Sequence, residues 1–185
     1  MEKETVLRLK SICLLAVIAA LLGWWLSTLN KPVSTSGVKE TFIWSVEPEE
    51  LEGIEISLPF RNLKKSWLVD GQQQWRFDEP DAPIVDSARW GQGIPLLLSG
   101  PRATRRIAVA ALGEELEQYG LAAPRMMVNL SLAGSKTLSI VVGGTTPSGR
   151  DVYVKLRADR VIYTVPTSWS EVLERLVVEP PYLGR

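Results

Sequence analysis

A long uncharged stretch near the N-terminus sets the main constraint on how this chain folds. Residues 11–30 read SICLLAVIAALLGWWLSTLN and contain no acidic or basic side chain. As an α-helix the stretch would be about 30 Å long at about 1.5 Å per residue, which matches the hydrocarbon core of a bilayer. Trp24 and Trp25 lie near its C-terminal end, and indole rings favour the membrane–water interface. We therefore predict a transmembrane helix over residues 11–30, with the lipid bilayer as its partner and Trp24 and Trp25 at the membrane interface.

The basic residues on either side of this stretch predict its orientation. Three precede it and two follow it closely: Lys3, Arg8 and Lys10, then Lys31 and Lys39. Flanks richer in Lys and Arg stay in the cytoplasm, so we predict a cytoplasmic N-terminus over residues 1–10 and a domain on the opposite side. A cleaved signal peptide is the alternative, but its cleavage site needs small residues. Bulky Trp24 and Trp25 occupy that region, which favours a retained anchor.

The rest of the chain divides into three parts by composition. Residues 31–39 contain Pro, Ser and Gly without apolar periodicity, which is typical of a tether. Residues 40–178 are numerous enough to bury a hydrophobic core without disulfides. Residues 179–185 read EPPYLGR and form a C-terminal tail, for which a recognition peptide and a frayed end are both open interpretations.

Composition excludes several kinds of chemistry in this domain. The chain has no histidine, and its one cysteine, Cys13, lies in the apolar stretch. The domain therefore lacks the commonest general base and metal ligand, and it has neither a disulfide nor a thiolate metal site. Basic and acidic residues balance at 21 each, so no overall field attracts nucleic acid. We expect no catalytic residues, no cofactor, no metal and no nucleic-acid partner.

Apolar periodicity predicts strands followed by a helix. Apolar residues alternate with polar ones over residues 54–58, 126–132 and 152–156, as in half-buried strands. A final helix is expected from Ser168, with five apolar residues at helical spacing: Trp169, Val172, Leu173, Leu176 and Val177. The predicted fold class is α+β: an N-terminal transmembrane helix, then a small domain of antiparallel sheet with a few helices packed on one side.

Turn signals punctuate these elements. Asp70-Gly71 predicts a hairpin, because glycine accepts the positive φ that such turns need. Asp86 is suited to cap a helix, which we expect to kink or break before Pro95. Gly120 is suited to end a short helix in the left-handed conformation.

Two kinds of side chain are candidates for partner contacts. Trp67 and Trp90 are predicted to anchor a partner or the membrane, because exposed tryptophan is a strong interface residue; core packing is the alternative. Arg102, Arg105 and Arg106 form a basic cluster in the sequence. A solvated connector and a contact to an acidic protein surface or anionic lipid headgroups are the two interpretations of that cluster.

A glycine-rich segment and the carboxylates are weaker candidates. Residues 143–150 read GGTTPSGR and suggest an anion-binding loop, but they lack the lysine and the following helix of a P-loop. A hairpin loop is the favoured interpretation. The acidic residues fall in expected turns and at an expected helix start, where acids are ordinarily structural.

Seven short motifs occur in a definite order along the chain. They are Ile54-Glu55-Ile56, Gly71 with Trp75, Pro83 with Asp86, Tyr119-Gly120-Leu121-Ala122-Ala123-Pro124, Gly143-Gly144, Gly149 with Tyr153, and Val161-Ile162-Tyr163-Thr164-Val165. In this order residues 40–178 resemble a bacterial family known as domain of unknown function 4340. The glycine- and proline-interrupted helix before Leu98 departs from the usual leucine-rich one.

The resemblance implies a role without known chemistry. Short, singly anchored, single-copy forms are similar to cyanobacterial ones, for which the family suggests a thylakoid protein that assists photosystem assembly. The expectation is therefore a non-catalytic assembly factor in a bacterial inner or thylakoid membrane. Its domain would be periplasmic or lumenal, and its partner a membrane complex such as photosystem II or its assembly intermediates. An accessory or ligand-binding subunit of a transporter or envelope system is the alternative.

Overall fold

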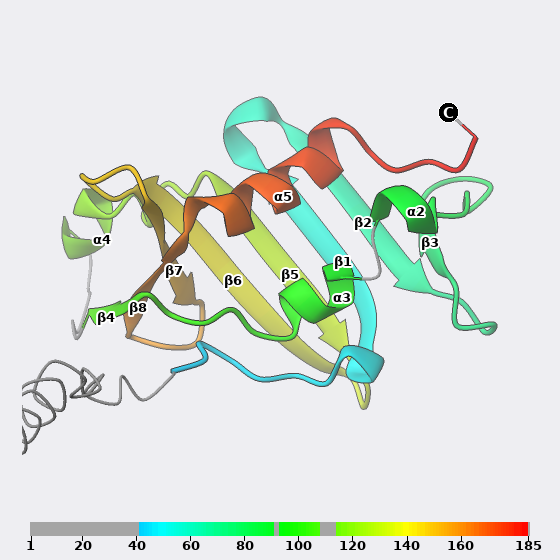
Figure 1. The fold of residues 1–185 in the computed structure, drawn as a ribbon, viewed down its shortest axis with the longest axis horizontal. Helices are drawn as coiled ribbons and strands as arrows, with labels where there is room; N and C mark the ends of the chain where they lie inside the picture. The colour runs from blue at the N-terminus through cyan, green and yellow to red at the C-terminus, as the bar shows by residue number, and fades with distance from the viewer. Residues whose placement is uncertain (1–40, 91–92, 108–113, 185) are drawn as a thin grey trace, which may run out of the picture. The chain divides into compact units, whose positions relative to one another are not determined.

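The alternating apolar residues of the domain lie in one antiparallel β-sheet. The computed structural model describes residues 41–90, 93–107 and 114–184. Eight strands are ordered β3-β2-β1-β5-β6-β7-β8-β4 across the sheet (Figure 1). Their bounds are β1 Leu51–Leu58, β2 Leu63–Val69, β3 Trp75–Phe77, β4 Arg105–Ile107, β5 Met126–Leu132, β6 Lys136–Thr145, β7 Asp151–Leu156 and β8 Ile162–Pro166.

The sheet joins two groups of hairpins through its central pair of strands. β1, β2 and β3 follow each other as one group, and β5 to β8 follow each other as the second. The two groups are joined because β1 pairs antiparallel with β5, so that Ile56 lies opposite Val128. Residues far apart in the sequence thus meet at the centre of the sheet, and the two groups share one core.

Short helices cover the sheet, and one long helix dominates. Their bounds are η1 Pro48–Glu50, η2 Pro59–Arg61, α2 Ser87–Trp90, α3 Gly93–Leu98, α4 Glu114–Gln118 and α5 Thr167–Val178. α5 crosses one face and packs on β1, β2, β7 and β8 (Figure 1). The predicted apolar stripe explains this packing, since Trp169, Leu173 and Leu176 are buried there, whereas Val172 is exposed.

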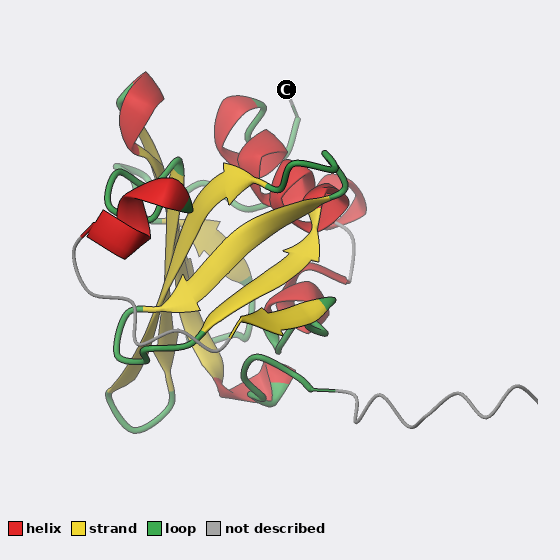
Figure 2. Cartoon of the chain, turned by 90° about the vertical axis from the view of Figure 1, so that its left-hand side faces the viewer, coloured by secondary structure: helices red, strands yellow, loops and turns green. Residues whose placement is uncertain are grey.

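The opposite face carries a second, smaller apolar cluster. Successive strand residues point to opposite faces; Tyr163 of β8 accordingly joins the main core, while its neighbour Ile162 joins the second cluster. Leu121, just after α4, forms this cluster with Ile162, and Leu116 of α4 packs against it. Helices therefore lie on both faces of the twisted sheet (Figure 2), rather than on the one side that the sequence predicted.

The region predicted as a helix after Asp86 is helical in its two described stretches, α2 and α3. The carboxylate of Asp86 accepts a hydrogen bond from the Ala88 amide at 2.9 Å, which confirms the predicted cap. Helix α3 continues through Pro95 as far as Leu98. Residues 91–92, which join the two helical stretches, lie outside the described part of the chain, so the kink or break predicted before Pro95 stays a prediction.

The hairpin between β2 and β3 forms, but its strained residue is not glycine. Gln73 adopts the positive φ, 61°, instead of Gly71. The side chain of Asp70 accepts hydrogen bonds from the amides of Gln72 and Gln74, at 2.8 and 2.9 Å. The Asp70 side chain therefore holds the loop amides in place, and the turn forms without the positive φ that was predicted for Gly71.

The C-terminal tail is folded onto the domain as far as Leu183. Val85 and Tyr182 form an antiparallel bridge, and the amide of Asp86 donates to the carbonyl of Pro181 at 2.8 Å. The Tyr182 ring stacks on Phe77 with 4.1 Å between centroids. The frayed end is therefore wrong for this part of the tail, whereas the recognition peptide stays a prediction.

The α+β class and the antiparallel sheet are confirmed. Within the described ranges, no helix is long and apolar enough to span a membrane. The predicted transmembrane helix 11–30, Trp24, Trp25, the cytoplasmic residues 1–10 and the tether 31–39 lie outside those ranges. Everything described belongs to one compact unit, Glu40–Arg185.

Candidate functional site

The motif that carries the family resemblance is a structural joint. The amide of Gly144 donates a hydrogen bond to the carbonyl of Tyr119 at 2.8 Å. Gly120 has φ +67°, and a Cβ atom there would lie 2.7 Å from the Gly144 nitrogen. A Cβ on Gly143 would lie 2.3 Å from the Tyr119 oxygen. The Tyr-Gly-Leu turn and the Gly-Gly pair therefore fit against each other, which gives the motif a folding role.

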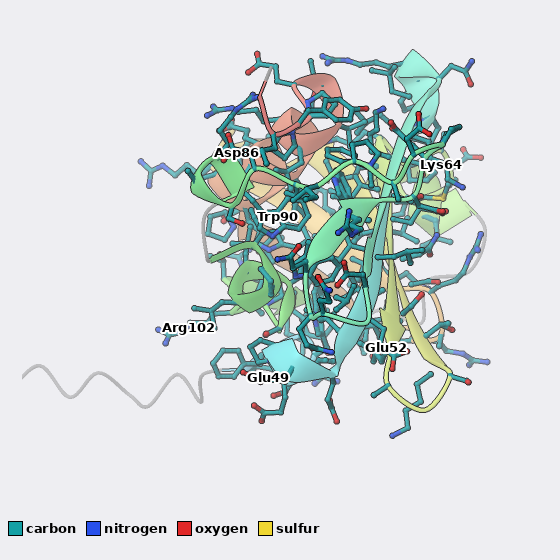
Figure 3. All side chains as sticks on the ribbon, turned by 90° about the vertical axis from the view of Figure 1, so that its right-hand side faces the viewer. Glu49, Glu52, Lys64, Asp86, Trp90 and Arg102 are labelled. Carbon is teal, nitrogen blue, oxygen red and sulfur yellow. The ribbon has the colours of Figure 1, made fainter. Side chains whose placement is uncertain are left out.

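Trp67 and Trp90 belong to the core, so the prediction that they contact a partner is wrong. Trp67 is 0% exposed and Trp90 is 5% exposed, and Figure 3 shows Trp90 enclosed by other side chains. Trp67 lies opposite Ile54 in the register of β1 and β2, which directs it to the core face. The two indole rings are 5.2 Å apart, and neither Nε1 has a hydrogen-bond partner among the described residues.

The three predicted arginines are exposed but do not form one patch. Arg105 and Arg106 are consecutive in β4 and pair with Thr164 and Tyr163 of β8. Consecutive strand residues point to opposite faces, so Arg106 shares the α5 face and Arg105 the α4 face. Arg102 lies before β4 and projects away from the domain (Figure 3). The predicted basic cluster was based on their closeness in sequence, which does not bring the three side chains together in the structure.

A groove beside α3 and α5 forms an open apolar hollow in the described part of the molecule. Its volume is about 510 Å³. α3, the segment that follows it and the N-terminal half of α5 form its walls. The lining residues are Gly93, Leu96, Leu97, Gly100, Pro101, Arg102, Pro166, Ser168, Trp169 and Val172. The lining is mostly apolar, and Arg102 is its one charged residue.

The side chains at the mouth of this groove are exposed although they are apolar. Leu96 is 67% exposed, and Val172 is also exposed. The sequence contained a weak signal for both. A helix of six residues with three consecutive leucines, as in α3, cannot bury all of them on one face, and the stripe predicted on α5 was wider than the face that packs.

The chain enters the domain along the wall of the groove. The amide of Ala103 donates to the carbonyl of Thr41 at 3.0 Å, and the amide of Ile43 donates to the carbonyl of Pro101 at 3.2 Å. Phe42 and Arg102 are paired in an antiparallel bridge, which places their side chains on the same side. Phe42 is itself exposed, so it adds a large apolar side chain beside the groove.

A second hollow, of about 380 Å³, lies at Arg105 on the α4 face and is more polar. It includes Thr146 and Ser148 of the glycine-rich segment, which joins β6 to β7 as the predicted hairpin loop. Their hydroxyls bond each other at 3.1 Å, and Asp151 accepts from Thr104 in the same hollow. A carboxylate at this position disfavours an anion, so the geometry does not favour the phosphate interpretation.

The uncovered part of the α4 face is a polar ladder across four strands. Lys64 pairs with Glu55, whose carboxylate accepts from Asn129 at 3.0 Å; Ser139 donates to Asn129 at 2.8 Å. The hydrogen bond from Lys64 lowers the pKa of Glu55, against partial desolvation, with further help from Asn129. These groups satisfy one another, which is typical of a solvated sheet face. The described residues contain no group of three or more Cys, Asp or Glu arranged to hold a metal ion.

The fold and the groove define the class: a small α+β domain with one antiparallel sheet and an open apolar groove. Residues 99–176 match a family described as Domain of unknown function (DUF4340), which confirms the resemblance drawn from the motifs. The match extends from the end of α3 into α5. Ile54-Glu55-Ile56 and the Gly71 hairpin lie before it. No curated protein and no solved structure matches the chain.

Proposed function

We propose that this protein is a non-catalytic, membrane-anchored accessory or assembly factor whose domain docks on a membrane protein complex. The observation that carries the proposal is the exposed apolar groove beside the point where the chain enters the domain. Large exposed apolar surfaces mark interaction sites. Thr41, which is hydrogen-bonded at the wall of the groove, follows the apolar stretch 11–30 by about ten residues in the sequence.

The predicted anchor and tether explain how weak contacts would suffice. About ten residues separate the apolar stretch from Thr41, and a flexible chain of that length spans roughly 17 Å on average. Such a tether keeps the domain at a high effective concentration relative to complexes in the same membrane. Docking on them then needs only modest affinity.

The family resemblance adds the specific candidate, photosystem II or its assembly intermediates in thylakoids. The corresponding location is a bacterial inner or thylakoid membrane, with the domain periplasmic or lumenal. Arg105 and Arg106 are the candidates for protein contact, because both are exposed on the terminal strand of the sheet. Arginine forks suit the carboxylates of an acidic partner surface.

An accessory or ligand-binding subunit of a transporter remains the second candidate. Small-ligand sites combine an apolar enclosure with a few converging polar groups. The groove is apolar but open along exposed Leu96 and Val172, and Arg102 and Ser168 are its few polar side chains. This geometry favours contact with an extended surface over enclosing a small molecule.

A pull-down of the tagged full-length protein in mild detergent tests the proposal. We expect photosystem subunits at near-stoichiometric levels by mass spectrometry, and their loss when residues 41–185 are deleted. The double variant Arg105→Glu/Arg106→Glu should weaken recovery. The matched double variant Arg157→Glu/Arg160→Glu, at exposed positions of the β7–β8 turn, should not. Recovery of transporter subunits would favour the second candidate and reject the photosystem.

A further inference from the structure

From the groove and its surroundings we infer that this face of the domain rests on the bilayer that holds the N-terminal segment, with Leu96, Val172 and Phe42 at the lipid headgroup–acyl boundary. The inference rests on the anchoring part of the proposed function. It goes further by assigning lipid to the groove, which leaves contact with the protein complex to Arg105 and Arg106 of β4.

The first support is the position of the chain that lies outside the structure. The forty residues before Thr41 include the uncharged stretch 11–30, and fully extended the intervening ten residues reach at most about 35 Å. Thr41 is hydrogen-bonded to Ala103, next to Arg102 of the groove. The exposed apolar side chains beside this connection are therefore the ones that we assign to the membrane surface.

The second support is the chemistry of the face. Interfacial surfaces place apolar side chains about 5–10 Å into the headgroup–acyl boundary. Leu96 and Phe42 are suited to that depth because both are large and exposed. Arg102 is paired with Phe42 and lines the groove together with Leu96, and its guanidinium suits phosphate oxygens of lipid headgroups.

The other end of the sheet provides a matched control. Phe60 of η2 is 74% exposed, similar to Leu96 at 67%. α3 packs near η1, at the start of β1, whereas η2 follows the end of β1. The eight residues of β1 separate these ends by about 26 Å at about 3.3 Å per residue.

The experiment uses the full-length chain with its one cysteine removed by Cys13→Ser, and with a single new cysteine from Leu96→Cys or Phe60→Cys. Each is labelled with an environment-sensitive fluorophore and reconstituted into vesicles of phosphatidylcholine and phosphatidylglycerol in equal parts, with or without doxyl-labelled lipid. We expect a blue-shifted emission that doxyl lipid quenches at position 96, and neither effect at position 60.

Each other outcome overturns the inference. Equal quenching at both positions means that no particular face meets the lipid, and no quenching at position 96 means that the groove does not. If emission at position 96 is blue-shifted only at high protein-to-lipid ratio and is not quenched by doxyl lipid, the groove is covered by a second copy of the chain. Vesicle flotation separates the two proposals: protein that floats without quenching refutes only the lipid contact, whereas protein that fails to float refutes anchoring as well.

Discussion

At the scale of single residues, Gly120 shows how one missing side chain joins two parts of the domain. Its φ of +67° is unfavourable for other residues, and its Cα faces the backbone of Gly144. Gly134 has a similar φ of +75°, but a Cβ atom there meets nothing within 4 Å. Comparing alanine variants of these two glycines therefore separates the energetic cost of a left-handed backbone from the cost of close contact with β6.

We predict that Gly134→Ala lowers the free energy of unfolding by about 1–2 kcal/mol, the ordinary cost of a left-handed alanine. Gly120→Ala should cost clearly more, because β6 must also move away from the turn. Urea unfolding followed by tryptophan fluorescence measures both. Equal midpoints for the two variants would show that the contact with Gly144 contributes nothing.

The tryptophans show where residue-level prediction from sequence reaches its limit. Composition and spacing do not tell a buried indole from an exposed one, since both occur in strands and short helices. The register with β1 decides the direction of Trp67, and packing against Trp67 and Trp75 decides that of Trp90. Both depend on contacts between segments that periodicity does not predict.

At the scale of elements, the C-terminal tail acts as a strap over β2 and β3. Besides stacking on Phe77, the Tyr182 hydroxyl lies 2.9 Å from the Glu79 carboxylate and 2.8 Å from Lys65. Desolvation opposes the charge on Lys65, but its bonds to Glu79 and Tyr182 outweigh it and raise the pKa of the lysine.

We expect Tyr182→Ala to destabilise the domain by about 2–4 kcal/mol, as for other large-to-small changes at packed aromatics. Leu183→Ala, at the exposed neighbouring residue, should change stability by less than about 0.5 kcal/mol. Thermal unfolding of both variants gives the comparison. A Tyr182→Ala variant as stable as the Leu183→Ala variant would mean that the tail is not fastened in solution.

The polar ladder predicts how stability depends on acid. Because the pKa of Glu55 is lowered from 4.5 in the folded state, its stabilising effect is fully present above the unfolded pKa and is lost as the pH falls below about 4.5. Glu55→Gln should therefore flatten the acid limb of the stability curve between neutral pH and pH 3. Urea midpoints across that range test it, with Glu52→Gln on the exposed part of β1 as the control. Identical acid limbs in wild type and Glu55→Gln would contradict the assignment.

Element-level prediction succeeds where local chemistry decides the outcome. The Asp86 cap, the Gly120 turn and α5 follow from a few adjacent residues, and all three are present. The groove does not follow in the same way, because it arises where α3 meets α5 across a long sequence separation. Its exposed leucine was visible in the sequence, but nothing local showed that Leu96 would face outwards.

At the scale of the whole molecule, one sheet unites the described residues. Glu40–Arg185 forms one compact unit, so we predict that a fragment of residues 40–185 folds without the N-terminal segment. It should unfold in a single cooperative transition, with coincident fluorescence and circular dichroism curves. Two separated transitions, divided at the β1–β5 boundary, would show that the hairpin groups fold independently.

The pairing of residues 41–46 with residues 99–103 has a mechanical consequence. Force from an anchored N-terminus acts first on the Thr41–Ala103 bond, then on Ile43–Pro101 and Val46–Ser99. These bonds are loaded one after another, as in a zipper, before any tension reaches β1 at the centre of the sheet. If the N-terminus is anchored as proposed, this segment would give way in steps before the core carries any tension.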